Sequence, residues 1–444
     1  MIYKIVVLVG MLGIFTHFSA VELKTDNGKD VGTVSGMIKA MHVLYDKDNG
    51  YTPNNGSGYL VKLKYESPDI FTDSLKVGIG AYLNGDTGLT EWESADKKPA
   101  RGMFAAPRGG ETAQFGEIYL SYKYKNRVRA KLGRQILNTP MTKIKFSLMP
   151  NFYEAYGIGT EVISGLSLDL MQITTLSYGS RAVTDWMLIG EATGTAGAPN
   201  VIEEKGGLGQ ADFISIKDIA GVDDSAGITA LGATYKGVKN LEVSIWDYYT
   251  DNIVNNFYAD AIYTLGLSES IKMKLSAQYL NQQSVDNFKN PYTKKDIDFW
   301  LAGAKAELKS KAWNFFIAYN QSSKSDQMYN IFGSDVAYTS SLFSRNQYRK
   351  DVKAYKFGGN YEVIKGLKLF ATYANYGKSK TVTTKGWQST TDAYEIDFCI
   401  IYKPTKAWFL AFCNAIRTSE YDGYGGAQRE QNHVRLIGSY SFNA

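Results

Sequence analysis

The chain has 444 residues, a formal net charge of +5, 43 glycines and only 9 prolines, with 21% charged and 14% aromatic residues. A mean hydropathy of -0.25 is too polar for a bundle of membrane helices, and the aromatic content is too high for a disordered chain. The mild positive charge is not gathered into a basic patch, which argues against a nucleic-acid partner. Abundant glycine and tyrosine with little proline favour long β-strands joined by loops.

Residues 1–20 have the pattern of a signal peptide. Lys4 precedes an apolar run, Ile5–Phe15, and Ala20 offers a small residue at the cleavage point. This run is shorter than the about 18 apolar residues that a spanning helix needs. We therefore expect an exported protein in which residues 21–444 form one domain.

From about residue 34 to the end, apolar and polar residues alternate, as in half-buried strands. Val61–Tyr65 and Val128–Leu132 are clear examples, with lysine or arginine on the polar face. Each candidate strand has about 9 to 13 residues, the length that crosses a bilayer when the strand is tilted. Eighteen candidates begin near residues 34, 58, 74, 115, 126, 153, 166, 227, 240, 255, 271, 298, 311, 353, 366, 392, 406 and 432.

The connections between these candidates alternate between short and long. Short turns fall near 125–126, 164–165, 237–239, 310, 364–365 and 404–405, and long polar loops cover 84–114, 137–152, 178–226, 283–297, 322–352, 378–391 and 419–431. Short turns at one end and long loops at the other are typical of an outer-membrane barrel. The sequence therefore predicts an all-β fold, an 18-stranded antiparallel transmembrane β-barrel with short periplasmic turns and long extracellular loops.

Aromatic residues gather at both ends of the predicted strands. Two girdles of rings, one at each membrane interface, explain this placement. Those next to the short turns or at the C-terminal end are Tyr65, Tyr124, Tyr235, Tyr263, Trp313, Tyr361, Tyr402, Trp408, Tyr440 and Phe442. Those at the opposite ends are Tyr59, Tyr279, Trp300, Tyr319, Tyr355 and Tyr394.

The sequence resembles the OprD-type outer-membrane porins, eighteen-stranded channels for small solutes. The most specific stretches are LGRQILNTPM at 132–141 and MPNFYEA at 149–155, which look like that family's fifth strand running into its third loop. The resemblance implies that the third and seventh loops, 137–152 and 322–352 here, fold inward and narrow the pore. Such barrels usually end on an aromatic residue that the outer-membrane assembly machinery reads, whereas Asn443 and Ala444 follow Phe442 here.

The polar face of the strands lines the lumen in a barrel of this size, and its charges are uneven. The second to fifth strands are mostly basic there, whereas the sixth to tenth are mostly acidic. On the second to fifth strands the basic residues are Lys62, Lys64, Lys76, Lys123, Arg127, Arg129 and Lys131, and the acidic residue is Glu117. On the sixth to tenth strands the acidic residues are Glu161, Asp169, Glu242 and Asp260, and the basic residue is Lys236.

Candidate pore-lining residues follow from this pattern. Arg129, Lys131 and Arg134 predict a basic ladder, although Arg134 breaks the alternation and needs a bulge at Gly133 to face inward. The full set of candidates is Arg129, Lys131, Arg134, Lys143, Lys145, Arg345, Arg349, Glu117, Glu161, Asp169 and Arg435. We expect the ladder to give a mild preference for anions.

The predicted function is passive or facilitated diffusion of small hydrophilic solutes through a charged constriction, and the resemblance implies small carboxylates or amino acids. The alternative is a structural or adhesive surface protein with a plugged lumen. We expect no enzyme activity and no cofactor or metal, since His42 and His433 lack the spacing of a metal motif. Outer-membrane lipid surrounds such a barrel, and monomer and homotrimer both remain open.

The two cysteines lie on the sixteenth and seventeenth predicted strands, on either side of the turn at Pro404 and Thr405. Apolar neighbours take the outward face, so both thiols point inward. They stand either directly opposite or one diagonal step apart. We expect Cys399 and Cys413 to be close without forming a bond.

Overall fold

The computed structural model describes residues 21–24, 28, 30–47, 56–71, 74–89, 111–125, 127–144, 147–179, 212–290, 294–329, 331–332, 334–342, 349–383, 386–422 and 428–442. The predicted signal peptide, Lys145, Arg345, Asn443 and Ala444 lie outside these residues. Within the described ranges, no helix has the length and hydrophobicity needed to span a membrane.

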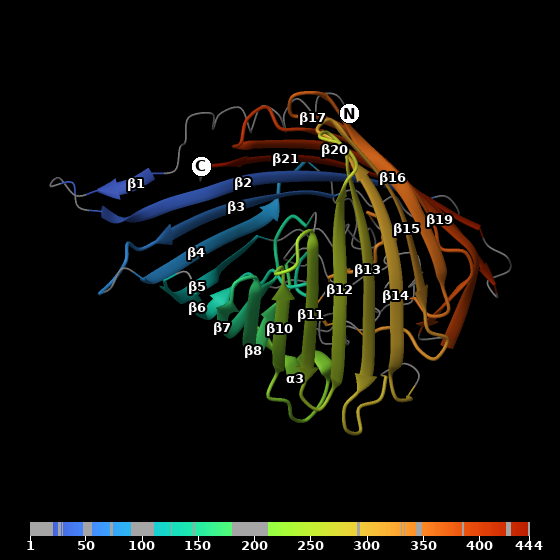
Figure 1. Cartoon of the computed structure of the whole chain (residues 1–444), viewed down its shortest axis with the longest axis horizontal. Helices are drawn as coiled ribbons and strands as arrows, with labels where there is room; N and C mark the ends of the chain where they lie inside the picture. Colours follow the sequence, from blue (N-terminus) through green and yellow to red (C-terminus); the bar gives the residue numbers. More distant parts are fainter. Residues whose placement is uncertain are drawn as a thin grey trace.

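Eighteen antiparallel strands form a closed barrel, as the alternation predicted (Figure 1). Closure comes from β21, near the end of the chain, which pairs with β2 from Met37↔Ser441 to Lys47↔Gln431. The wall strands are β2 Asp30–Lys47, β3 Gly56–Glu66, β4 Leu75–Asp86, β5 Thr112–Tyr124, β6 Val128–Gln135, β7 Phe152–Ile163, β8 Leu166–Ser177, β10 Ile228–Tyr235, β11 Leu241–Thr250, β12 Val254–Gly266, β13 Lys272–Ser284, β14 Asp298–Lys309, β15 Trp313–Ser322, β16 Lys353–Ile364, β17 Leu367–Asn375, β19 Gly386–Tyr402, β20 Trp408–Asp422 and β21 Gln428–Ser441.

Three short strands pair with a single neighbour each: β1, Val21–Lys24, with β2; β9, Ile214–Ser215, with β8; and β18, Ser379–Thr383, with β19. A short helix, α3, covers Ile216–Ala220. The Ser215 hydroxyl accepts the N–H of Asp218 at its start, and Gly221 ends it in the left-handed conformation. Strands β9 and β18 and helix α3 belong to the connections between wall strands, and β1 precedes the first wall strand.

Most predicted strand starts lie within two residues of the observed ones, and the largest difference is at β19, which begins at Gly386 instead of near 392. Strands β2, β19, β20 and β21 exceed the predicted 13 residues. Their extra residues continue the ladders where polar residues no longer alternate with apolar ones. Alternation therefore located the spanning part of each strand and missed its extension.

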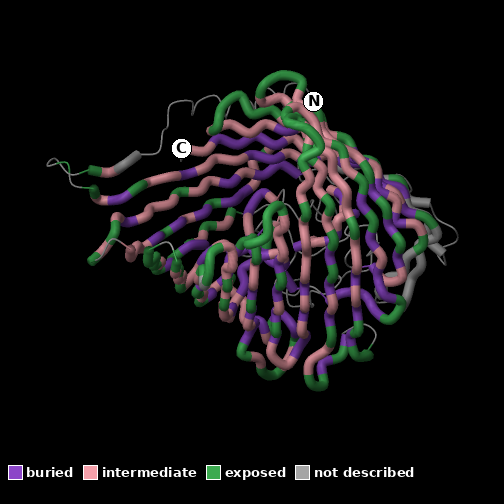
Figure 2. Tube along the Cα trace, in the orientation of Figure 1, coloured by how far each residue is buried: buried purple, intermediate pink, exposed green. Residues whose placement is uncertain are grey.

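Burial changes from residue to residue along the strands (Figure 2), because successive side chains face the lumen and the outer surface in turn. The outer surface carries exposed apolar residues such as Leu132, Ile158 and Ile317. Aromatic residues stand beside one another across strands near both ends, with Trp313 opposite Tyr361 at the short turns and Tyr319 opposite Tyr355 at the other end. Rings at both levels agree with a wall that spans a bilayer.

Cys399 on β19 and Cys413 on β20 form a disulfide, so the expectation of two close but unbonded thiols was wrong. The register places the two residues directly opposite, with 4.1 Å between their Cα atoms. That spacing belongs to the pairs of an antiparallel ladder whose side chains approach most closely. Sequence could fix the inward face of both residues but not this register.

We expect the double variant Cys399→Ser, Cys413→Ser to form the barrel with lower stability. The disulfide joins residues with a sequence separation of 14. Closing a loop of this size raises the free energy of unfolding by about 3 kcal/mol, because it lowers the conformational entropy of the unfolded chain. Urea unfolding of the detergent-refolded barrel measures the difference, and wild type treated with reductant serves as the control. Equal unfolding midpoints for the oxidised wild type and the variant would contradict a stabilising role.

Candidate functional site in the barrel lumen

The third loop, between β6 and β7, crosses the lumen. The Met141 N–H donates to the Tyr248 hydroxyl on β11 at 3.5 Å, and the Lys39 ammonium on β2 donates to the Ser147 carbonyl. Leu148 and Met149 pack on apolar residues of β2, β3, β4, β20 and β21. Because β2 and β11 lie on nearly opposite sides of the ring, this loop divides the channel at its level.

The seventh loop, between β15 and β16, also packs inside the barrel. Met328, Tyr329 and Phe332 join one apolar cluster with inward residues of β8 and β10 to β14. The two loops touch, because the Asn151 amide donates to the Phe332 carbonyl at 3.0 Å. Both loops therefore narrow the lumen, as the resemblance implied.

Charged wall residues bind the far end of the seventh loop. The Leu342 N–H donates to Asp397 on β19 at 3.2 Å, and the Lys356 ammonium on β16 donates to the Ser340 carbonyl at 2.9 Å. The candidate Arg349 is fully buried, with its guanidinium 4.3 Å from the centre of the Tyr376 ring. Arg349 thus fastens the loop and does not face the channel, whereas Lys143 on the third loop is exposed.

The start of the seventh loop carries a buried carboxyl group. Asp326 accepts the N–H of Gln327 at 2.8 Å and the Asn290 amide of the preceding loop at 3.2 Å. Burial nevertheless raises the pKa of Asp326 above its usual value. This contact joins the two neighbouring loops at the extracellular end.

Below the third loop, Glu117 is the centre of a charged cluster on the β3–β6 wall. It lies 3.4 Å from the Lys62 ammonium and 3.5 Å from that of Lys64, and it accepts the Tyr82 hydroxyl at 2.6 Å. Lys131 stands 3.7 Å from the centre of the Tyr119 ring, in the same cluster. Because Glu117 is buried, its carboxylate mainly contacts these lysines and has little exposure to the solute path.

Arg129 on β6 and Asp169 on β8 form an ion pair at 2.6 Å across the intervening strand β7. Gly159 lies between them, and a Cβ there would come within 2.5 Å of the Asp169 Oδ1 and 2.7 Å of the Arg129 guanidinium carbon. Only glycine leaves room for the two side chains to meet. The predicted ladder residue is therefore paired with a residue of the predicted acidic stretch.

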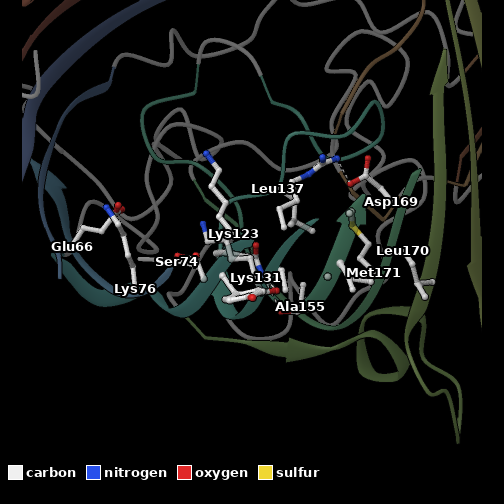
Figure 3. A pocket seen from close by; sticks show the side chains of 18 of the residues that line it. Glu66, Ser74, Lys76, Lys123, Lys131, Leu137, Ala155, Asp169, Leu170 and Met171 are labelled. Carbon is white, nitrogen blue, oxygen red and sulfur yellow. Dashed lines mark hydrogen bonds and ion pairs between the residues drawn. The ribbon is translucent and has the colours of Figure 1, made fainter. Parts of the chain in front are cut away.

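A cavity of about 590 Å³ opens in this part of the wall (Figure 3). Its floor on β7 consists of Ala155, Gly157 and Gly159, three successive inward positions with little or no side chain. Lys76 and Lys123 line one end, and Asp169, the partner of Arg129, lines the other. Among the described residues, no carboxylate lies within 4 Å of either ammonium group, and both lysines line the cavity.

Other candidates take different places. Arg134 does not line this cavity: it pairs with Glu154 at 2.8 Å and lies 4.2 Å from the Phe213 ring. The pairing of β5 with β6 has no register shift at Gly133, which has a φ of 114°. Arg134 therefore stands opposite Ile118, whose side chain faces outward. Glu161 accepts the N–H of Gly165 at a short turn. Arg435 faces inward beside Cys413 and donates to His433 at 3.3 Å.

Sequence reasoning missed four buried charged residues on β16, β19 and β20. Arg417 on β20 and Glu395 on β19 form a fully buried pair at 3.4 Å, and Asp397 on β19 lies 3.9 Å from the Lys356 ammonium on β16. The alternation of β16, β19 and β20 places all four inward, and this signal could have found them. His42 and His433 lie on opposite faces, and the described residues hold no cluster that could ligate a metal ion.

A family model for outer membrane porins, the OprD family, matches residues 61–444. The chain belongs to this family. No curated protein matches the sequence. The fold is similar to that of Pseudomonas aeruginosa OccK9 (OpdG), with a TM-score of 0.71 and 15% identity over 92% of this chain and 98% of that one. It is also similar to Acinetobacter baumannii OccAB4, with a TM-score of 0.67 and 14% identity over 94% and 99%.

Membership in this family makes the protein an outer-membrane channel for small solutes in a Gram-negative bacterium. The described geometry fits this role, since inward loops leave a lumen lined by charged groups. The family consists of channels and not of enzymes.

We expect Asp169→Asn to shift the reversal potential of this porin towards anion preference. The substitution removes the carboxylate that compensates Arg129, so the guanidinium charge acts on the channel. Planar-bilayer recording in a salt gradient measures the shift. Asp247→Asn, at an outward position of β11, is the matched control and should leave the potential unchanged. An equal shift in both variants would show that the Arg129–Asp169 pair has no local effect.

Proposed function

We propose that this porin conducts small solutes bearing a carboxylate, such as small carboxylates or amino acids, with a mild preference for anions. The observation that carries the proposal is the excess of basic over acidic groups at inward strand positions. The basic ones are Lys39, Lys62, Lys64, Lys76, Lys123, Arg129, Lys131, Lys272, Lys274, Lys305, Lys309, Lys356, Lys368, Arg417 and Arg435. The acidic ones are Glu66, Asp86, Glu117, Glu161, Asp169, Glu242, Asp260, Glu307, Glu362, Glu395 and Asp397.

The free ammonium groups carry most of this preference. In the part of the chain that the structure describes, no carboxylate lies within 4 Å of the Lys76 or Lys123 ammonium, and the Lys131 ammonium stands 3.7 Å from the centre of the Tyr119 ring. A carboxylate that loses part of its hydration at the constriction regains favourable interactions at such fixed charges. Two solved structures with this fold, P. aeruginosa OpdK with vanillate and OccK2 (OpdF) with glucuronate, contain carboxylates, which agrees with the proposal.

Three further parts of the proposal concern the whole chain. Residues 1–20 act as a signal peptide that is removed on export. The terminal strand up to Phe442 is read by the outer-membrane assembly machinery. The barrel conducts as a monomer or as one unit of a homotrimer, since each barrel encloses its own lumen.

Planar-bilayer recording of the purified porin in asymmetric KCl tests the proposal. We expect open-channel conductance and a reversal potential that indicates anion preference. Arg129→Gln combined with Lys131→Gln should move the potential towards cation preference, because two inward positive charges are lost. Lys353→Gln removes an outward charge on β16 and serves as the control.

The same recording separates the proposal from its alternative. A protein that inserts but carries no current would favour a plugged surface protein, in which the packed third and seventh loops close the lumen. Conductance with cation preference would retain the channel and reject the carboxylate solutes.

A further inference from the structure

Three primary amides on the inner wall hold the backbone of the seventh loop. Gln278 and Gln282 lie on β13 and Asn320 lies on β15, all at inward positions and all buried. We call these three residues the amide row. Each member of the row binds the main chain of the loop between Tyr329 and Thr339.

Gln282 binds one residue twice. Its oxygen accepts the N–H of Tyr329 at 2.7 Å, and its nitrogen donates to the Tyr329 carbonyl at 2.6 Å. This is the pair of bonds that a neighbouring strand would make in an antiparallel ladder. A loop inside a barrel has no such neighbour, so the side chain supplies the missing partner for the buried backbone.

Gln278 and Asn320 repeat this arrangement further along the loop. Gln278 accepts the N–H of Tyr338 at 2.9 Å and donates to the Val336 carbonyl at 2.8 Å. Asn320 accepts both the N–H of Thr339 at 2.9 Å and its hydroxyl at 3.0 Å. The loop is thus bound to the wall at three separate points.

The wall between these amides is shaped to bring them together. Gly303 on β14 pairs with Gln278 on one side and with Asn320 on the other. A Cβ at this position would come within 2.1 Å of the Asn320 amide nitrogen and 3.1 Å of Gln278 Cγ. The missing side chain lets the two amides approach, with Asn320 donating to Gln278 at 3.4 Å.

We propose that Gln278, Gln282 and Asn320 are positioning residues that set the width of the channel by holding the seventh loop against β13–β15. The loop's apolar contacts keep it inside the barrel, but such contacts are not directional. The amide bonds fix which backbone atoms face the wall and hence how far the loop extends into the lumen. Width is separate from the charge preference proposed above.

Liposome swelling with neutral sugars of increasing size tests this role. Gln282→Ala, Gln278→Ala and Asn320→Ala should raise the swelling rate for a disaccharide relative to a monosaccharide, which is a loss of size exclusion. Single-channel conductance should rise in the same variants. The ion preference should stay at the wild-type value, because none of these residues is charged, and this result distinguishes the inference from the proposed function.

Two further variants keep the test decisive. Gln282→Met and Gln278→Met retain the side-chain volume and remove the hydrogen bonds, so they report on the amides where an alanine variant fails to fold. Gln283→Ala replaces an exposed glutamine on the outward face of β13 and is the matched control. Wild-type size exclusion in the folded methionine variants, or equal loss in Gln283→Ala, would overturn the role of the amide row.

Discussion

The requirement that every backbone N–H and C=O in the hydrocarbon region has a partner determines this structure. A sheet meets that requirement only when its first and last strands pair, and here β21 pairs with β2 over eleven positions, from Met37↔Ser441 to Lys47↔Gln431. Closure then separates two environments. Residues facing lipid must be apolar, while those facing the lumen can be charged, which is why alternation runs through nearly the whole chain.

The same requirement acts a second time inside the barrel. The third and seventh loops bring irregular backbone into a narrow space, where it needs partners as it would in a protein core. The wall provides them from inward side chains: Lys39 for Ser147, Asp397 for Leu342, and the amide row for Tyr329 to Thr339. Inward polar residues therefore fall into two groups, those that bind loops and those that face solutes.

Charge in the lumen is compensated locally. Glu117 serves two lysines, and Asp169 meets Arg129 across Gly159. Along the chain these groups look like separate basic and acidic stretches, but β6 and β8 are next-nearest neighbours in the wall. Lys76 and Lys123, beside the wall cavity, have no carboxylate within 4 Å among the described residues. In the proposed function, these two lysines are part of the excess of basic groups that favours anions.

The sequence by itself determined the number of wall strands, their faces and the rhythm of their connections, because strand periodicity and turn composition are local properties. It also placed Cys399, Cys413, Arg129 and Asp169 inward. Only the tertiary structure decided that the cysteines bond, that Arg129 pairs with Asp169, that Arg134 turns away and that Arg349 of the seventh loop is buried. These outcomes depend on cross-strand register and on loops packing across the lumen, contacts between residues far apart in the chain that no local pattern encodes.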